Sequence, residues 1–204
     1  MNLLERRRAM MVQGGGGSIL PSGYTQLDYI ENTSNAFIFL PPISSGTKIE
    51  TYFAPDLNNI PRTYGCICGV DSNLQIAFLP AGKANVGNAT SLNVFYTNGV
   101  KAKVNATFDA SSSNSAYIVN DVNTNLHRAY TSTYKFAVFG ASSNNTSATY
   151  IARGKMYSFK MWNSSDVLIH DLIPCTDPNN IYGMYDIVGE IFYSSENSDT
   201  FSGG

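Results

Sequence analysis

The chain has 204 residues, of which 43 % are hydrophobic and only 14 % are charged, and its formal net charge is −2. This length and hydrophobic fraction exclude a wholly disordered chain and suit one domain, or one domain with a short appendage. Asn, Ser and Thr supply 58 residues, which favours turns and strands over long helices. The basic cluster Arg6-Arg7-Arg8 is too small for strong nucleic-acid binding, and no apolar run is long enough to predict membrane insertion.

The N-terminal segment predicts a short helix over residues 2–11, followed by a Gly-rich tether over residues 12–18. Five side chains share one side of this helix: Leu3, Leu4, Arg7, Met10 and Met11. A helix this short is unstable alone, so we expect it to dock on a partner or to bundle with copies of itself. A disordered leader is the alternative. The predicted organisation is therefore an anchor segment, residues 1–18, and a domain, residues 19–204.

From residue 23 onward the chain consists of short runs rich in Tyr, Phe, Ile, Val and Thr, separated by turn signals. No stretch keeps a 3.6-residue period over three turns. This pattern predicts an all-β fold, an antiparallel two-sheet sandwich or jelly roll. The expected strands cover residues 24–30, 36–40, 47–53, 65–70, 74–79, 92–97, 103–109, 116–120, 135–139, 151–162, 167–173, 183–187 and 191–193.

Alternation within two of these runs predicts which side chains face the core. The expected core set is Ile49, Thr51, Phe53, Tyr157, Phe159 and Met161. The expected opposite set is Lys48, Glu50, Tyr52, Met156, Ser158, Lys160 and Trp162. Asn98-Gly99 is the strongest hairpin signal in the chain.

The three cysteines, Cys66, Cys68 and Cys175, cannot all pair within one chain. Cys66 and Cys68 are two residues apart, so on a regular strand they point the same way, and they lack the spacing of a redox or zinc site. We predict buried free thiols in a protein that folds in a reducing compartment.

Segments at both ends of the domain carry a family resemblance. Residues 23–31 read G-Y-T-Q-L-D-Y-I-E, residues 154–160 read G-K-M-Y-S-F-K, and residues 166–175 read D-V-L-I-H-D-L-I-P-C, with G-M-Y-D at 183–186. They resemble the first and last strands of concanavalin A-like (LamG-type) jelly-roll domains of gut bacteria and their tailed phages. The family usually has a small polar edge where residues 37–40 read F-I-F-L, which leaves open whether this strand faces the core or a neighbour.

The resemblance implies a non-enzymatic virion protein: a fibre, tail-appendage or capsid-decoration protein that docks on other virion proteins by its N-terminus. It further implies a homo-oligomer, with a trimer as the default, assembled in the bacterial host cytoplasm and attaching to a host-surface glycan. The alternative is a bacterial carbohydrate-binding or adhesion module, and a glycoside hydrolase is the third possibility.

Two places have the residue types of a carbohydrate site, which pairs an exposed aromatic ring with amide, carboxylate and hydroxyl groups. The first is Trp162, out of phase with the expected core set and followed by polar residues 163–165. The second is the loop that contains Asp71 and Asn73. Partial burial at an edge or interface is the alternative for Trp162, and a plain Asx-turn is the alternative for the loop.

Hydrolase chemistry needs two carboxylates on one face, and the sequence does not provide them. Glu50 is alone in its strand, and Asp28 and Glu31 are three residues apart, hence on opposite faces. Neither His127 nor His170 belongs to a spacing that binds zinc. We therefore predict no catalytic residues, no metal and no cofactor.

Overall fold

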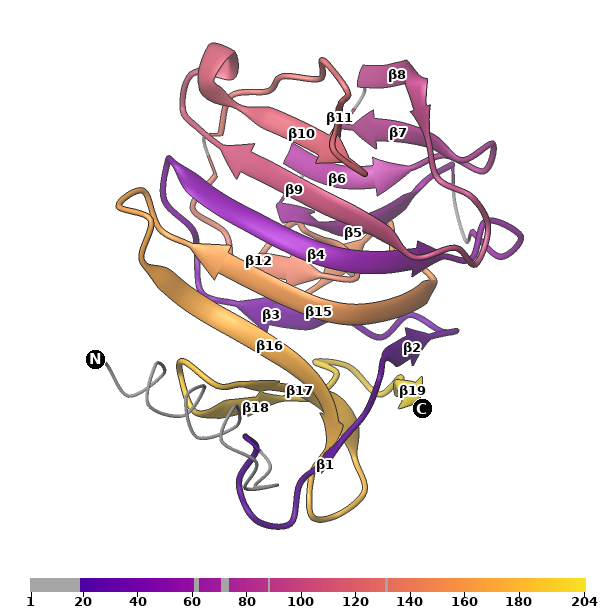
Figure 1. Ribbon diagram of the computed structural model, residues 1–204, viewed down its shortest axis with the longest axis vertical. Coiled ribbons are helices and arrows are strands. Elements are labelled where there is room, and N and C mark those ends of the chain that lie inside the picture. Colours follow the sequence, from indigo (N-terminus) through magenta and orange to yellow (C-terminus); the bar gives the residue numbers. More distant parts are fainter. Residues whose placement is uncertain (1–18, 61–62, 71–73, 88, 131) are drawn as a thin grey trace.

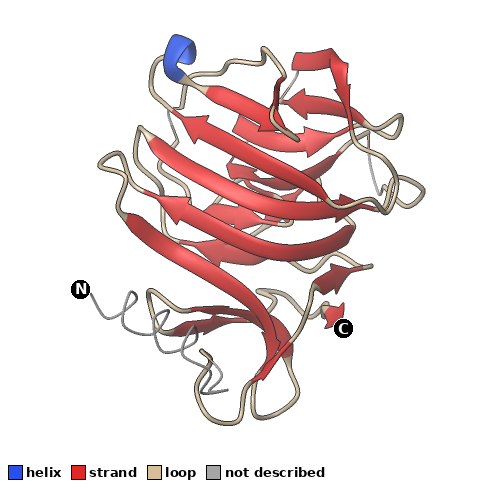
Figure 2. Ribbon diagram, viewed as in Figure 1, coloured by secondary structure: helices blue, strands red, loops and turns tan. Residues whose placement is uncertain are grey.

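The computed structural model describes residues 19–60, 63–70, 74–87, 89–130 and 132–204. These residues form a sandwich of two β-sheets, with one sheet in front of the other in Figure 1. Figure 2 shows how little helix accompanies the strands: the described part contains one short 3₁₀-helix, Ser112–Asn114. No helix in the described part is long and apolar enough to cross a membrane. The expected anchor helix and tether lie outside the described residues.

The front sheet has 11 strands, eight of them in one continuous path. In spatial order this path is β11 (Val122–Asn123), β10 (Ala116–Val119), β9 (Ala102–Phe108), β4 (Thr47–Pro55), β15 (Gly154–Trp162), β16 (Leu168–Thr176), β17 (Tyr182–Asp186) and β18 (Ile191–Tyr193). Three short strands extend this sheet in the lower half of Figure 1: β1 (Thr25–Gln26) pairs with β16, β2 (Ile30–Asn32) pairs with β15, and β19 (Ser202–Gly203) pairs with β2. Because β1 pairs with β16 and β19 with β2, both ends of the domain enter the same sheet.

The back sheet has eight strands. They are β14 (Ala148–Thr149), β13 (Ala141–Ser142), β5 (Gly65–Val70), β6 (Leu74–Phe78), β7 (Lys83–Val86), β8 (Ala89–Phe95), β12 (Phe136–Val138) and β3 (Ile38–Leu40). Among the described strands, every pairing is antiparallel except that of β13 with β5. The all-β, two-sheet antiparallel architecture predicted from the sequence is therefore confirmed.

The core fills the space between the sheets, and β4 shows why the sequence places it there. Ile49, Thr51 and Phe53 are at most 2 % exposed, while the residues between them are half-buried or exposed. Alternation from Thr47 to Phe53 turns one face to the core, as predicted. Thr51, the polar member, satisfies its hydroxyl by donating to the carbonyl oxygen of Ser158 at 2.7 Å.

Strand β15 departs from the predicted alternation at a β-bulge. Its register with β4 shifts between Met156 and Ser158, so Tyr157 is an extra residue without a partner in β4. A bulge breaks the alternation, so side chains before it are out of phase with those after it. As a result Met156 is buried and Tyr157 only half-buried, so the prediction of Tyr157 in the core and Met156 opposite was wrong. Phe159, like Met161, is fully buried as predicted.

A second bulge corrects the prediction for the cysteines. The register of β5 with β6 shifts between Cys66 and Cys68, so the two thiols lie in different apolar clusters rather than on one side. Cys66, Cys68 and Cys175 are all free and buried, as predicted. Burial raises the pKa of the Cys175 thiol to about 12, and that of Cys68 is also raised. These thiols are therefore protonated and unreactive at neutral pH.

The Asn98-Gly99 turn does not form the predicted hairpin. It connects β8 of the back sheet to β9 of the front sheet, and these strands do not pair with each other. The turn is held by tertiary contacts: the amide oxygen of Asn98 accepts from the N–H of Leu57 at 2.6 Å, and the N–H of Gly99 donates to Pro55 at 2.8 Å. The sequence thus predicted a turn at the right place, but the two strands that this turn joins belong to different sheets.

The apolar segment at residues 37–40 is covered by the chain itself. Ile38 and Leu40 face the core, while Phe37 and Phe39 pack with Ile151 on the other side of the sheet. Both phenylalanines are only 5 % exposed. The sequence left open whether this strand faces the core or a neighbour. In the described fold the strand is buried on both faces by the chain itself.

Candidate functional site

The strands of the front sheet bring polar and aromatic side chains together on the face that points away from the back sheet, which we call the outer face. Directly opposite residues of an antiparallel pair share a face. The register places one row across four strands: Ala116, Thr107, Lys48 and Trp162. It places the next row across five: Ile118, Asn105, Glu50, Lys160 and Asp171.

A hollow of about 310 Å³ lies over these two rows. Its floor is sheet, and its rim includes the loop that follows β15. The residues that line it are Lys48, Ile49, Glu50, Asn105, Ala106, Thr107, Ala116, Ile118, Trp162 and Asp166. An indole ring, an amide, a hydroxyl and charged groups therefore surround one space, and we call it the Trp162 hollow.

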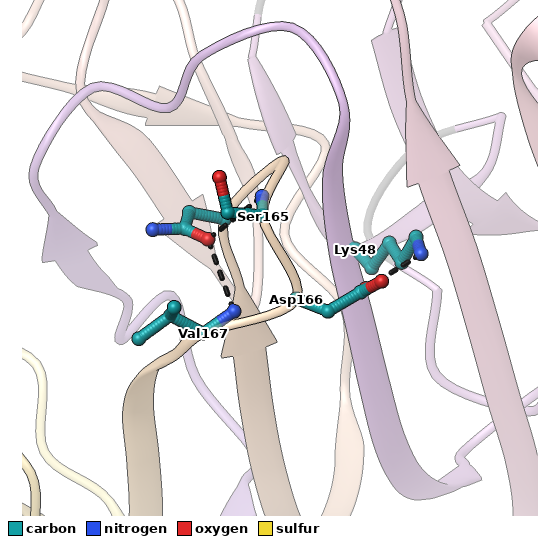
Figure 3. Close-up of polar contacts among 5 residues, drawn as sticks. Lys48, Ser165, Asp166 and Val167 are labelled. Carbon is teal, nitrogen blue, oxygen red and sulfur yellow. Dashed lines mark hydrogen bonds and ion pairs between the residues drawn. The ribbon is translucent and has the colours of Figure 1, made fainter.

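The loop at residues 163–167 holds one rim of the hollow in place. The side-chain oxygen of Asn163 accepts hydrogen bonds from the N–H groups of Ser165 and Val167, both at 3.0 Å. This Asx-type turn carries Asp166 at a positive φ of 58°. Figure 3 shows the result: the Asp166 carboxylate points to the Lys48 ammonium on β4, with Oδ1 and Nζ 2.6 Å apart.

Ion pairs balance the other charges around the hollow. Lys103 Nζ lies 3.2 Å from Glu50 Oε2, and Lys160 Nζ lies 3.5 Å from Asp171 Oδ2. The hydrogen bond and the negative charge of Glu50 raise the pKa of Lys103. Because each lysine faces a carboxylate, the surface offers many hydrogen-bonding groups with little net charge. That chemistry suits a hydroxylated, uncharged ligand better than an ion.

Of the residues predicted for carbohydrate binding, the structure places Trp162 in the hollow. It is half-buried on the outer face, on the side opposite to Phe159 and Met161, as alternation predicted. Its role in binding stays a prediction. Asp71 and Asn73 lie outside the described residues, as do the docking residues of the N-terminal segment.

Sequence reasoning missed the partners of Trp162. Lys48 and Glu50 were assigned to the solvent face of their strand, but nothing marked them as neighbours of Trp162. Asp166 is 118 residues away from Lys48 in the chain. The alternation of K-V-N-A-T at residues 103–107 is the signal that could have placed Asn105 and Thr107 beside them.

A second polar cluster lies on the hairpin of β16 and β17. His170 Nδ1 is 2.6 Å from Asp186 Oδ2, and Asp186 is fully buried. Asp186 Oδ1 accepts from the N–H groups of Asp171 and Val188, both at 3.0 Å. Burial raises the pKa of Asp186, but the hydrogen bonds from His170 and the two N–H groups outweigh it, so the net shift is downward. With only 13 % of the His170 side chain exposed, this is a structural hydrogen-bonded pair rather than an open site.

The remaining acidic and histidine candidates do not assemble a catalytic or metal centre. Glu50 is paired with Lys103, Asp28 is exposed elsewhere, and Glu31 lies on β2. His127 is exposed, with a ring nitrogen on the Ser115 carbonyl oxygen. Within the described ranges, no three or more His, Cys, Asp or Glu side chains are grouped as metal ligands.

Comparison with known proteins adds evidence on the fold. No family model and no curated protein matches the chain. Among solved structures, it is similar to one from Bacteroides ovatus described as "a putative carbohydrate binding protein", with a TM-score of 0.57 and 13 % identity. The match covers 88 % of this chain and 60 % of that one, so this chain spans less than two thirds of its neighbour. At this identity the likeness establishes a shared β-sandwich fold.

Proposed function

We propose that this protein is a non-enzymatic module that binds carbohydrate in the Trp162 hollow. One observation carries the proposal: a half-buried indole ring lies beside hydroxyl, amide, ammonium and carboxylate groups around a hollow of about 310 Å³. The volume falls at the small end of the range for small-molecule pockets. The similarity to a β-sandwich described as carbohydrate-binding supports the same class of function.

The chemistry of the hollow fits a sugar ring. The apolar C–H face of a sugar packs on an aromatic face, and its hydroxyl groups donate and accept hydrogen bonds in fixed directions. Trp162 supplies the aromatic surface, and Asn105 and Thr107 supply neutral polar groups on the floor. The Lys48–Asp166 pair supplies a donor and an acceptor at the rim.

The same residues argue against hydrolysis. A glycosidase needs one carboxyl group to donate a proton and a second to act as nucleophile or base. The two carboxylates that line the hollow, Glu50 and Asp166, each lie within ion-pair distance of a lysine. Both carboxylates thus already have a lysine partner, which differs from the acid and nucleophile pair of a glycosidase.

The test is a glycan array that includes bacterial capsular polysaccharides, followed by titration of the best ligand. We expect saturable binding that weakens about tenfold or more in Trp162→Ala, because the aromatic platform is lost, with Trp162→Phe in between. Tyr134→Ala is the matched control, since Tyr134 is exposed outside the hollow. Equal affinity of Trp162→Ala and wild type, or a blank array with folded protein, would contradict the proposal.

The virion role implied by the resemblance is a finer and separate proposal, as is the concanavalin A-like jelly-roll assignment. Display on a particle, a trimeric state and docking through the N-terminal segment all depend on residues 1–18, which lie outside the described fold. Detection of the chain in purified phage particles, and its loss on deletion of residues 1–18, would support that role. Binding in the Trp162 hollow is independent of it.

A further inference from the structure

The outer face of the front sheet continues past the Trp162 hollow into a group of tyrosines and lysines. We call this group the Tyr–Lys cluster: Tyr29, Tyr52, Tyr157, Lys101 and Lys155. Lys101 Nζ lies 5.2 Å from the ring centroid of Tyr52 and 4.6 Å from that of Tyr157. Lys155 Nζ lies 4.1 Å from the ring centroid of Tyr29, and the Tyr29 and Tyr157 centroids are 5.7 Å apart.

The strands explain why these side chains meet. Tyr52 follows Glu50 by two residues on β4, so it occupies the same outer face. The bulge in β15 turns Tyr157 outward, and Lys155 lies opposite Glu31 of β2. Trp162 and Tyr157 are five residues apart on β15, roughly 16 Å along the strand. A ligand of several sugar rings, but no single ring, can therefore contact both places.

The electrostatics of the cluster differ from those of the hollow. In the described part of the chain, Lys101 and Lys155 have no carboxylate within ion-pair distance, whereas Lys48, Lys103 and Lys160 each have one. The hydrogen bond with Tyr29, together with the nearby charge of Glu31, raises the pKa of Lys155. Lys101 and Lys155 are thus two positive groups without an ion-pair partner, with Glu31 opposite Lys155 as the nearby negative charge, on a protein whose formal net charge is −2.

An ammonium group above an aromatic ring is attracted by the ring face and still keeps N–H donors for other acceptors. The three tyrosines of the cluster also carry phenol hydroxyl groups, which donate and accept hydrogen bonds. This combination complements an anionic oxygen group, because charge-assisted hydrogen bonds from lysine to carboxylate are about twice as strong as neutral ones. An uncharged hydroxyl group also accepts from the ammonium, but it lacks the added attraction between opposite charges.

We propose, as an extension of the carbohydrate-binding function above, that the Tyr–Lys cluster is a second subsite for the carboxylate of an acidic polysaccharide. The polysaccharide lies along β15, with one sugar on Trp162 and a uronate-type residue at Lys101 and Lys155. The hollow then provides affinity for the sugar, and the cluster selects for charge.

The experiment compares capsular polysaccharides printed in their native acidic form and in carboxyl-reduced, uncharged form. We expect the wild-type protein to prefer the native form by about tenfold. The double variant Lys101→Ala/Lys155→Ala binds both forms with the affinity that the wild type shows for the reduced form. Lys83→Ala/Lys135→Ala removes the same charge from the back-sheet side, where Lys135 also lies over a ring, and keeps the preference.

Each other outcome is decisive. Equal binding of native and reduced polymers by the wild type overturns this inference and leaves the proposed function intact. A loss of preference in Lys83→Ala/Lys135→Ala equal to that in the cluster variant, or competition by single-stranded DNA as strong as by the native polymer, shows general attraction of polyanions and also overturns it. No binding of any polymer to folded wild-type protein rejects both proposals.

Discussion

At the scale of single residues, the fully buried Asp186 ties the acid stability of the fold to one carboxylate. The pKa of Asp186 is lowered in the folded state, so the folded chain favours the ionised form more than the unfolded chain does. Its contribution to stability is therefore complete above the unfolded pKa of about 3.8 and is lost as the pH falls through the folded pKa, below 3.8. We expect Asp186→Asn to lower the free energy of unfolding at pH 7 by about 1–3 kcal/mol, because the carboxylate that His170 and the two N–H groups stabilise is lost.

The measurement is urea unfolding at pH 7 and at pH 3. Between these values the stability of the wild type falls more than that of Asp186→Asn, since the variant has no carboxylate to protonate at this position. Asp28→Asn, which changes an exposed carboxylate, serves as the control. A variant whose pH dependence equals that of the wild type would show that Asp186 is not the group responsible.

At the scale of elements, regular strands were predictable from the sequence and irregular ones were not. Alternation placed Ile49 and Phe53 correctly because β4 pairs with β9 without a register shift. It failed for the face of Tyr157 and for the relative direction of the Cys66 and Cys68 side chains, because a β-bulge lies at each place. A bulge depends on the partner strand and leaves no mark in a single sequence. Strand β7 was missed because K-A-N-V has too few strand-favouring residues, and the neighbouring strands β6 and β8 supply its pairing.

The same limit applies to the site. Trp162 could be placed on the outer face from its phase relative to Phe159 and Met161. Its neighbours Lys48 and Asp166 could not be joined to it, because the β4–β15 pairing brings together segments more than a hundred residues apart. Local pattern thus predicts on which face a residue lies, and only topology determines which strands share that face.

Gly154, at the start of β15, is a position where a side chain has no room. Its φ is +134°, and a Cβ there would lie 2.2 Å from the Ala54 carbonyl oxygen, which is backbone and cannot turn away. We expect Gly154→Ala to reduce the free energy of unfolding by about 2–4 kcal/mol, measured by urea denaturation. Gly99→Ala is the control, since Gly99 has φ +68° but nothing within 4 Å, and its cost is about 1 kcal/mol. Equal effects of both substitutions would mean that backbone strain alone, without the clash, accounts for the loss.

At the scale of the whole molecule, the two ends of the domain close the front sheet. Ser202 of β19 pairs with Glu31 of β2, and the Gly204 carbonyl oxygen accepts from the N–H groups of Asp28 and Tyr29. Phe201 is 3 % exposed, and its ring lies 5.1 Å from that of Phe139, which faces the core beside the back sheet. The last residues therefore connect the edge of one sheet to the space between both.

This connection predicts that the C-terminal residues stabilise the entire sandwich rather than only their own strand. Phe201→Ala removes a buried aromatic side chain and leaves a cavity, which costs about 3–5 kcal/mol, or about 10 °C in Tm for a chain of this size. Removal of residues 200–204 adds the loss of the β2–β19 pairing and lowers Tm further. Phe201→Leu retains most of the buried volume and should recover most of the loss.

Because the core is shared by both sheets, unfolding followed by calorimetry should remain a single transition in each variant. Two separate transitions in the shortened chain would show instead that the sheets unfold independently and that the C-terminal segment stabilises only the front one.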